Sequence, residues 1–232
     1  MGLQETLLSP AIEAKIKNYN IIRKDNLQNE RSVGGVAILY LQNLPSKPVH
    51  LNTTLQAVAV QVQIKTLMAV CSIYLPLSQT IQQSELDVKS DLTLVRQLSP
   101  PFIILGDWND HSSFWGSTDS NTRGLQIEKL MSDQNLCLLN DSSHAFFHLP
   151  TRTFHTLDLA LCSPFLVAKW NFNVDNNLYN SDHFALILTL SSNDVILPKR
   201  PSRFIFDKTN WQLFQELAGL TTEMIQLADI ND

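Results

Sequence analysis

Glycine is scarce in this chain, with 7 residues in 232. None of them forms the GxGxxG turn of a dinucleotide-binding fold or the glycine-rich loop that cradles nucleotide phosphates. The sequence also contains no internal repeat and no low-complexity run. These absences exclude the Rossmann-type and P-loop classes and leave a chain whose chemistry has to be found in other motifs.

Long apolar runs and paired cysteines are absent as well. No apolar stretch approaches the ~18 residues of a membrane span, and the first residues, MGLQETLLSP, lack the basic and apolar parts of a signal peptide. Cys71, Cys137 and Cys162 lie far apart and form no CxxC pair. We interpret them as small core residues in a reducing compartment. We therefore expect an intracellular protein, nuclear or cytoplasmic, that is not secreted and has no membrane partner.

Positive charge is in deficit, with 17 Lys and Arg against 22 Asp and Glu and a net charge of −5. A protein that holds nucleic acid by bulk electrostatics is expected to be basic. A DNA partner would therefore have to meet a local basic patch or be bound with the help of a cation. The densest basic run is Lys199, Arg200 and Arg203, which we interpret as a solvated linker or a phosphate contact.

The hydrophobic content of 44% is enough for an ordinary core. Alternating or continuous apolar patterns predict strands, and a turn marked by two prolines is predicted at 41–52. Strands outnumber helices and a strict βα alternation is missing, so we predict an α/β fold, a two-sheet sandwich with flanking helices. The predicted strands are 33–41, 57–64, 67–76, 102–105, 136–140, 156–162 and 184–190.

Two helices are predicted beside these strands. The first begins at a capping box formed by Ser84 and Asp87 and continues at helical spacing to Leu98. The second covers 124–134 and is predicted to turn Leu125, Leu130 and Met131 inward.

The character of the sequence changes near Ser191, where a polar, proline-containing stretch begins. A further helix is predicted from about Asp207, with an apolar stripe formed by Trp211, Phe214 and Leu217. We therefore predict two parts, a domain over 1–190 and a linker with a helix over 191–232.

Acidic residues recur where the predicted strands end. Asp107 follows FIIL, Asp158 lies in TLDLAL, and Asp182 and His183 come directly before FALILTL; Glu5 follows Leu3. A single acid at such a place is usually a turn residue or a helix cap. Several of them, accompanied by Asn109 and histidines, favour a site at the rim of a sheet.

The reaction that needs such a set is metal-assisted hydrolysis of a phosphodiester. A divalent ion prefers carboxylate oxygens together with substrate phosphate, and it neutralises the charge that develops on phosphorus. An Asp aided by an Asn can deprotonate an attacking water. A His oriented by another Asp can stabilise the transition state.

The motifs LQET (3–6), GGVAIL (34–39), SIYLP (72–76), GDWN (106–109), WGS with NxRG (115–124), LDLAL (157–161) and SDHFAL (181–186) occur in this order. Together they resemble the exonuclease–endonuclease–phosphatase superfamily. Within it, the chain is most similar to the endonuclease domain of non-LTR, LINE-type retrotransposons of the jockey-like kind. The resemblance covers nearly all of residues 1–190 and implies the two-sheet sandwich already predicted.

The resemblance also implies roles for individual residues. Glu5 would be the metal ligand for Mg²⁺, with Mn²⁺ as an alternative, and Asp182 would support the metal or the leaving group. The catalytic residues would be Tyr74 at the phosphate, Asp107 and Asn109 at the attacking water, and the pair Asp158 and His183. The substrate-binding residues would be Thr151, with Thr153 as the alternative, together with His111 and Arg123; Arg123 fits a structural ion pair equally well.

One departure from the family pattern affects the expected activity. Family members begin with a strand that carries a metal-binding Asn before the QET motif, and this chain starts at Met1 directly before LQET. The sandwich is thus predicted without its first strand, which leaves an unpaired edge and an exposed core face. At the other end, 201–214 resembles the connector to a reverse transcriptase on the same chain in a full element.

Three functions remain open at this stage. The first is a Mg²⁺-dependent domain that nicks DNA, without a small-molecule cofactor. The second is a catalytically impaired, truncated relic without independent activity. The third is a phosphatase or phosphodiesterase of the same superfamily acting on lipid or inositol phosphates. We interpret His144, His148 and His155 as solvated loop histidines, because their spacing matches no metal-binding motif.

Overall fold

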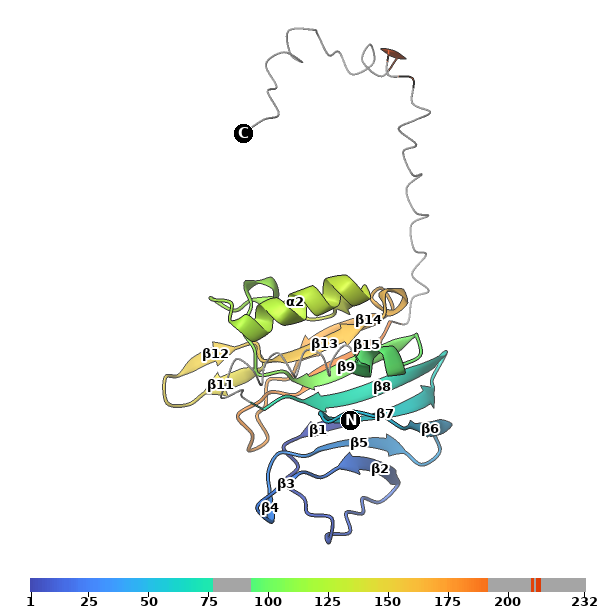
Figure 1. Ribbon diagram of the computed structural model, residues 1–232, viewed down its shortest axis with the longest axis vertical. Coiled ribbons are helices and arrows are strands. Elements are labelled where there is room, and N and C mark those ends of the chain that lie inside the picture. Colours follow the sequence, from blue (N-terminus) through green and yellow to red (C-terminus); the bar gives the residue numbers. More distant parts are fainter. Residues whose placement is uncertain (77–92, 192–209, 211, 214–232) are drawn as a thin grey trace. The chain divides into compact units, whose positions relative to one another are not determined.

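The computed structural model describes residues 1–76, 93–191, 210, 212 and 213. The chain divides into two units, Met1–Val195 and Ile196–Asp232, and Figure 1 labels the strands and the helix of the first. The predicted capping box at 84–87 and nearly all of the predicted linker and helix after residue 191 lie outside the described residues. The fold below is that of the first unit.

A sheet of six strands forms the middle of this unit, in the order β10-β13-β9-β8-β7-β6. The pair β8–β9 is parallel and the other pairs are antiparallel. The apolar patterns that predicted five of these strands, all but β6, are confirmed, because continuous apolar runs form the central strands. Their bounds are β6 Ser46–Val49, β7 Gln56–Gln63, β8 Leu67–Tyr74, β9 Phe102–Asp107, β10 Cys137–Leu138 and β13 Asp158–Cys162.

The predicted turn at 41–52 is partly wrong, because β6 lies within it. β6 is the edge strand of the sheet and contains Pro48, paired with Val60. An edge strand tolerates proline because one side of the strand needs no N–H donor. The proline therefore marked a sheet edge rather than the absence of a strand.

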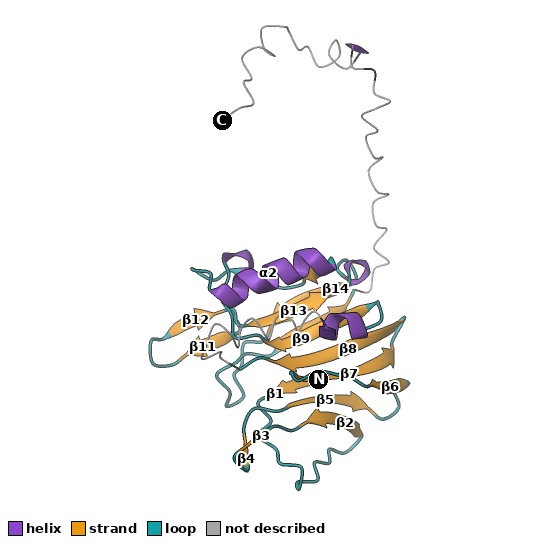
Figure 2. Ribbon diagram, viewed as in Figure 1, coloured by secondary structure: helices purple, strands orange, loops and turns teal. Residues whose placement is uncertain are grey.

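One face of the large sheet is covered by smaller β elements (Figure 2). A three-stranded sheet, in the order β1-β5-β2, packs there through Val36, Ile38 and Ile22, and the hairpin β14–β15 packs there through Trp170, Phe172 and Leu188. This arrangement of two β layers is the predicted sandwich. The bounds are β1 Gly2–Gln4, β2 Tyr19–Lys24, β5 Val36–Leu41, β14 Trp170–Val174 and β15 Leu186–Leu190.

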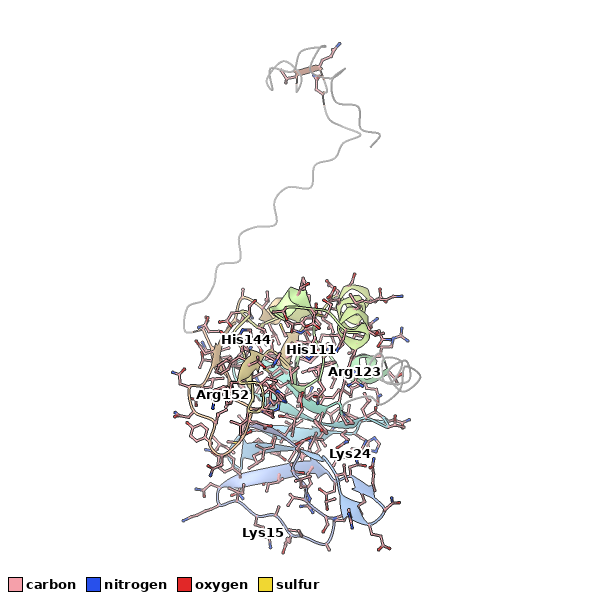
Figure 3. The ribbon with its side chains drawn as sticks, turned by 90° about the vertical axis from the view of Figure 1, so that its left-hand side faces the viewer. Lys15, Lys24, His111, Arg123, His144 and Arg152 are labelled. Carbon is pink, nitrogen blue, oxygen red and sulfur yellow. The ribbon has the colours of Figure 1, made fainter. Side chains whose placement is uncertain are left out.

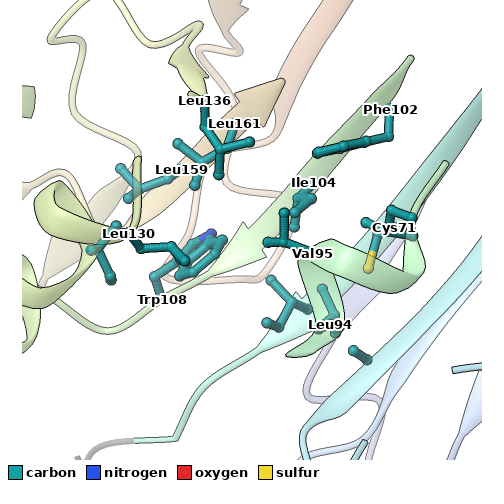
Figure 4. Close-up of a cluster of buried hydrophobic side chains, with 14 of the residues drawn as sticks. Cys71, Leu94, Val95, Phe102, Ile104, Trp108, Leu130, Leu136, Leu159 and Leu161 are labelled. Carbon is teal, nitrogen blue, oxygen red and sulfur yellow. The ribbon is translucent and has the colours of Figure 1, made fainter. Parts of the chain in front are cut away.

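The opposite face of the sheet packs against helices. Helix α2 (Thr122–Gln134) and the helical residues 93–97 cover a core around Trp108, as Figure 4 shows. Leu130 and Met131 of α2 are buried as predicted, but Leu125 is exposed and Ile127 takes the inner position instead. A helical face advances by about 100° per residue, and Leu125 falls outside the inward stripe. The short 3-10 helix η1 Ser113–Trp115 adds the buried Trp115 to this layer, whereas Leu166 of the 3-10 helix η2 Pro164–Leu166 packs on the other face of the sheet.

Two further β pairs project from the sandwich. The pair β3–β4 consists of Leu27–Gln28 and Arg31–Ser32, and the hairpin β11–β12 consists of Phe146–His148 and Thr153–His155. The hairpin is bound to the segment before β15, because Phe147 N donates to Asp182 O and Phe184 N donates to Ala145 O. It therefore lies beside the predicted catalytic residues 182 and 183.

The second β layer has open strand edges within the described part of the chain. There, β1 pairs only with β5, and β15 pairs only with β14. Val70 of β8 and Leu105 of β9 belong to the sheet face under this layer, yet they are only half-buried although both strands are central. An unpaired edge and an exposed core face were predicted from the sequence; β1 has an open edge in the described chain, Val70 and Leu105 are half-buried, and the absence of a first strand stays a prediction.

The cysteines agree with the expected core role in part. Cys71 and Cys162 are buried, Cys137 is half-buried, and all three are free. Burial raises the pKa of the Cys71 thiol to about 12, so it is a small apolar residue rather than a nucleophile. No helix within the described segments has the length and apolar character needed to span a bilayer.

Candidate active site

Three adjacent strands bring polar side chains to one rim of the large sheet. Tyr74 ends β8 and is the parallel partner of Asp107, which ends β9. Asp158 begins β13 and is the antiparallel partner of Asp107. Partners in register point to the same face of a sheet, so the three side chains stand in a row. The apolar strand that ends in GDWN therefore places Asp107 at the centre of that row.

Gly106 lets β9 approach β8 closely at this point. A Cβ atom added to Gly106 would lie 1.8 Å from the carbonyl oxygen of Ile73. No side chain can be accommodated at such a distance. The glycine of GDWN therefore fixes the spacing between the strand ends that carry Tyr74 and Asp107.

Asn109 holds the carboxylate of Asp107 in place. Its backbone N–H donates to Asp107 Oδ1 over 2.9 Å, and its side-chain Nδ2 donates to Asp107 Oδ2 over 2.8 Å. The same Nδ2 donates to Leu75 O over 3.0 Å, which joins the ends of β8 and β9. Asn109 has a φ of 49°, in the left-handed region that asparagine tolerates better than most residues. An asparagine at this position thus serves both the backbone and the acid.

The carboxyl group of Asp107 is a weaker acid than an ordinary aspartic acid. Burial, followed by the nearby charge of Asp158, raises the pKa of Asp107 to about 7. The charge of His183 and the hydrogen bond from Asn109 oppose this rise without cancelling it. A carboxyl group with a pKa near 7 is matched to proton transfer at neutral pH.

His183 forms a hydrogen-bonded pair with Asp158. Its Nδ1 lies 2.7 Å from Asp158 Oδ2. Burial alone would lower the pKa of His183, but the hydrogen bond to Asp158 and the charge of that residue raise it to about 9. The imidazole is therefore held as a cation, with its second nitrogen available to another group.

Glu5 reaches this row from the other β layer. It follows β1, and its carboxylate accepts a hydrogen bond from the hydroxyl group of Tyr74. Burial, followed by the bond to Glu5, raises the pKa of Tyr74, so the phenol stays protonated and remains a donor. The structure thus brings together Glu5, Tyr74, Asp107, Asn109, Asp158 and His183, which come from five separate stretches of the sequence.

The other predicted site residues lie around this group. Asp182 is exposed beside His183, and its charge helps to raise the pKa of both His183 and Asp158. Thr151 lies in the exposed turn of the β11–β12 hairpin. His111 is half-buried after β9, with its ring 5.5 Å from the ring of His155. Their predicted roles stay predictions.

Arg123, predicted as a substrate contact or as a structural residue, is buried and not at the surface. Its side chain is buried at the start of α2, and Nη1 donates to Pro76 O over 2.9 Å and to Trp108 O over 3.4 Å. These carbonyl groups follow the ends of β8 and β9. Arg123 therefore supports the backbone around Asn109 from behind the site.

The sequence interpretation missed the role of the β11–β12 hairpin. Residues 146–148 and 153–155 are strands, so the reading of this segment as a loop is wrong. Phe146 bridges to His183 in the backbone, and the two ring centroids are 4.7 Å apart. The alternation of Phe and His in FFH and TFH was the available signal, but it is too short to be distinguished from a polar loop.

The oxygen donors of this site suit a divalent cation that is bound by one or two carboxylates and keeps coordination positions for water and substrate. Glu5 and Asp107 provide carboxylate oxygens close enough for the charge of Glu5 to raise the pKa of Asp107. Across the described residues, no group of three or more His, Cys, Asp or Glu side chains is arranged to enclose a metal. Mg²⁺ is usually held by one or two carboxylates with water and substrate phosphate rather than by an all-protein cage. The residues fit that kind of binding.

Comparisons with known proteins identify the class. A family model described as endonuclease-reverse transcriptase matches residues 68–187, a span that contains the GDWN, LDLAL and SDH motifs. The match covers more than half of the chain, so the chain belongs to this family. The resemblance to a retrotransposon endonuclease domain is thereby confirmed.

Two particular relatives support the assignment. The chain is 25% identical over 217 residues to a probable RNA-directed DNA polymerase from transposon X-element of Drosophila melanogaster, a match that covers 92% of this chain and 23% of that protein. The chain thus spans less than a quarter of the length of this relative. The endonuclease domain of TRAS1, a telomere-specific non-LTR retrotransposon, has the same fold, with a TM-score of 0.63, 18% identity, and coverage of 75% of this chain and 81% of that one.

Proposed function

We propose that residues 1–190 form a metal-dependent phosphodiesterase that nicks DNA. The observation that carries the proposal is the convergence of Asp107, Asn109 and the Asp158–His183 pair at one rim, with the pKa of Asp107 near 7. Membership in the endonuclease-reverse transcriptase family supports a nuclease over another kind of hydrolase.

The side chains divide the work of the reaction. Asp107 accepts a proton from the attacking water, since its pKa lies close to neutral pH. Asn109 fixes the direction of that carboxylate through its two hydrogen bonds. His183, kept cationic by Asp158, stabilises the negative charge that grows on the phosphate oxygens. Tyr74 donates a hydrogen bond at the same rim.

Glu5, supported by Asp182, would hold Mg²⁺ or Mn²⁺ in this site. The ion would supply Lewis-acid neutralisation of charge on the phosphate when it is bound. Without an ion, burial disfavours the ionised form of Asp107, and repulsion by the nearby carboxylates of Asp158 and Glu5 adds to this, so the pKa of Asp107 is raised. This repulsion is the physical reason to expect a cation among them.

The substrate proposed here is double-stranded DNA, and the full protein would carry a reverse transcriptase on the same chain. The relative from transposon X-element is described as an RNA-directed DNA polymerase, and the chain spans 23% of its length. A nick made by this domain would then supply the primer end for the polymerase. Both statements rest on the relative and are part of the proposal.

A nicking assay on supercoiled plasmid with Mg²⁺ tests the proposal. We expect conversion to the open circle by the unmodified chain, and its loss in Asp107→Ala and in His183→Ala. His50→Ala is the matched control, since His50 is an exposed residue after β6. Nicking that persists in both site variants would show that this rim is not the catalytic centre.

A second candidate is a domain of the same family with impaired activity. The open edges of β1 and β15 and the half-buried Val70 and Leu105 favour it, because a loosely covered face gives the site a less rigid support. No nicking by this chain, followed by nicking when a strand is added before Met1, would select this candidate. Phosphate release from inositol phosphates with intact plasmid would instead select the third function.

A further inference from the structure

Two of the three cysteines face each other across neighbouring strands, although they are far apart in the sequence. Cys137 begins β10 and is the antiparallel partner of Cys162, which ends β13. Both are free thiols, and residues 138–161 separate them along the chain. Partners in register project from the same face of a sheet. The fold therefore brings together two thiols that no sequence motif groups.

The surroundings of the two thiols place them in one cluster of side chains. Cys162 is fully buried in the cluster under the smaller β layer, and the half-buried Cys137 packs against the same cluster. Burial, followed by the nearby charge of Cys137, raises the pKa of Cys162 to about 12, an effect that requires the two sulfur atoms to be close. Cys71 lies in the cluster on the other face of the sheet. The two thiols are thus neighbours, and Cys71 is not part of the pair.

The spacing of such a pair is close to that of a disulfide. Directly opposite residues of an antiparallel pair have Cβ atoms about 4.5–5.5 Å apart, whereas a disulfide needs about 3.5–4.5 Å. β10 can supply the remaining approach of about 1 Å, because it has only two residues and lies at the edge of the sheet in the described part of the chain. The hydrogen bond from Leu139 N to Ala160 O keeps the register beside the pair during such a movement.

The two thiols differ in access, and this difference sets the order of a reaction between them. A reagent from solution reaches the half-buried Cys137 rather than the fully buried Cys162. Thiolate is the attacking species in thiol–disulfide exchange, so Cys162 is a poor first nucleophile. The basic side chains labelled in Figure 3 all lie outside β10 and β13, and neither strand contains a cation that would favour the Cys162 thiolate. Cys137 is therefore the point of entry, and Cys162 completes the reaction.

We propose that Cys137 and Cys162 form a redox-active pair, which closes to an intramolecular disulfide by exchange with a small disulfide. In the first step, Cys137 loses its proton and its sulfur attacks one sulfur of the small disulfide, whose S–S bond breaks and releases one small thiolate. In the second step, Cys162 loses its proton and attacks the sulfur of Cys137, which releases the second small thiolate. Two protein thiols are oxidised, the small disulfide is reduced to two thiols, and these take up the two protons.

The pair lies at the opposite end of β13 from the catalytic rim. Asp158 begins this strand and Cys162 ends it, so the two residues are about 13 Å apart along the strand. The new bond joins the edge strand β10 to the central sheet and closes a loop over residues 138–161, which restricts the unfolded chain. The proposal therefore concerns the stability of the domain under oxidising conditions, and it does not depend on the proposed function.

Mass spectrometry of the full chain after exposure to oxidised glutathione tests the proposal. The folded protein is incubated at about pH 8 with a fixed ratio of oxidised to reduced glutathione, its free thiols are alkylated in urea, and it is digested without reduction. We expect two peptides linked through Cys137 and Cys162, preceded in time by a glutathione adduct on Cys137, with Cys71 recovered as an alkylated thiol. A glutathione adduct that never closes, a link to Cys71, or a disulfide-linked dimer would overturn the proposal.

The same incubation in urea separates the effect of the fold from that of the short sequence separation. A fold that holds the two sulfur atoms together favours closure, and by linkage the disulfide then stabilises the fold. We expect the ratio of linked to reduced chains, at one glutathione ratio, to be about tenfold or more higher for the folded protein than in urea. The Tm should rise by about 5 °C or more on oxidation. An equal ratio in urea, or a Tm that does not rise, would contradict the proposal.

Alanine variants identify the two sulfur atoms. Cys137→Ala and Cys162→Ala should each lose the linked peptides and the rise in Tm on oxidation, and only Cys162→Ala should keep the glutathione adduct as its end product. Cys71→Ala is the matched control, since Cys71 is a buried cysteine on the other face of the sheet, and it should form the disulfide like the unmodified chain. A rise in Tm that persists in either variant of the pair would refute the assignment. The peptide map of the unmodified chain decides the question even where a variant fails to fold.

Discussion

The carboxyl group of Asp107 is buried beside a second carboxyl group, and this placement has opposite effects on stability and on chemistry. A pKa of about 7 means that the folded protein holds a proton on Asp107 which the unfolded chain releases near pH 4. Ionisation of Asp107 therefore destabilises the fold increasingly as the pH rises from about 4 to about 7, and the full effect persists above that range. The loss of stability accompanies the use of Asp107 as a base, because both follow from its raised pKa.

Replacement of Asp107 should separate its effect on stability from its effect on catalysis. We expect Asp107→Asn to raise the free energy of unfolding by about 2 kcal/mol at about pH 8 in metal-free buffer. The substitution removes a charge that is disfavoured by burial and repelled by Asp158, and it loses one hydrogen bond to Asn109. The gain should vanish as the pH approaches about 4. Urea unfolding across this pH range measures it. An equal gain at both ends of the range would refute the raised pKa, and nicking should be lost throughout.

The charge of His183 depends on Asp158 in a way that can be measured directly. In Asp158→Asn, burial should dominate, so the pKa of His183 should drop from about 9 to below its ordinary range. The stabilisation from the pair is complete below the unfolded pKa of about 6.5 and is lost as the pH rises through about 9. NMR titration of the His183 ring protons reads the pKa. Asp141→Asn is the control, and a His183 pKa that stays near 9 in Asp158→Asn would contradict the pairing.

At the scale of elements, the sequence was most informative where one pattern dominated. The apolar run before Asp107 could only be a buried strand, and its polar end marked the site. The hairpin at 146–155 could not be predicted, because its strands alternate aromatic and polar residues over three positions each. Leu125 was misplaced for a related reason: the inner face of α2 includes Gly124, where an added Cβ would lie 2.0 Å from His111 O, so close backbone packing rather than hydrophobicity sets the orientation of the helix.

Arg123 ties this helix to the two strand ends, and its removal should be felt as a loss of stability. We expect Arg123→Ala to lower the free energy of unfolding by about 3 kcal/mol, since Pro76 O and Trp108 O lose their donor and the buried Asp110 loses a nearby positive charge. Lys129→Ala, on the exposed side of the same helix, should change stability by less than about 0.5 kcal/mol. Equal stability of the two variants, with weaker DNA binding in Arg123→Ala, would instead support the surface role predicted from the sequence.

At the scale of the whole domain, the site exists because the central sheet and the smaller β layer meet at one rim. Glu5 belongs to the smaller layer, Asp107 and Asp158 belong to the central sheet, and His183 comes from the segment before the hairpin strand β15. Periodicity predicts the strands but contains no information on their order in space. The resemblance supplied that order, which is why residues separated by almost the whole domain could be grouped before the fold was known.

The same arrangement leaves the two faces of the central sheet unequally covered. The burial of two neighbouring residues of β9 shows the difference. Ile104 faces the helices and is fully buried, whereas Leu105 faces the smaller β layer and is half-buried. We expect Ile104→Ala to lower the free energy of unfolding by about 3–4 kcal/mol and Leu105→Ala by about 1 kcal/mol, since the latter removes little buried area and creates no closed cavity. Chemical denaturation of both variants measures the difference. Equal losses would mean that the sheet face under the smaller β layer is as well covered as the helical face. The observation that favours the impaired-domain candidate would then be lost.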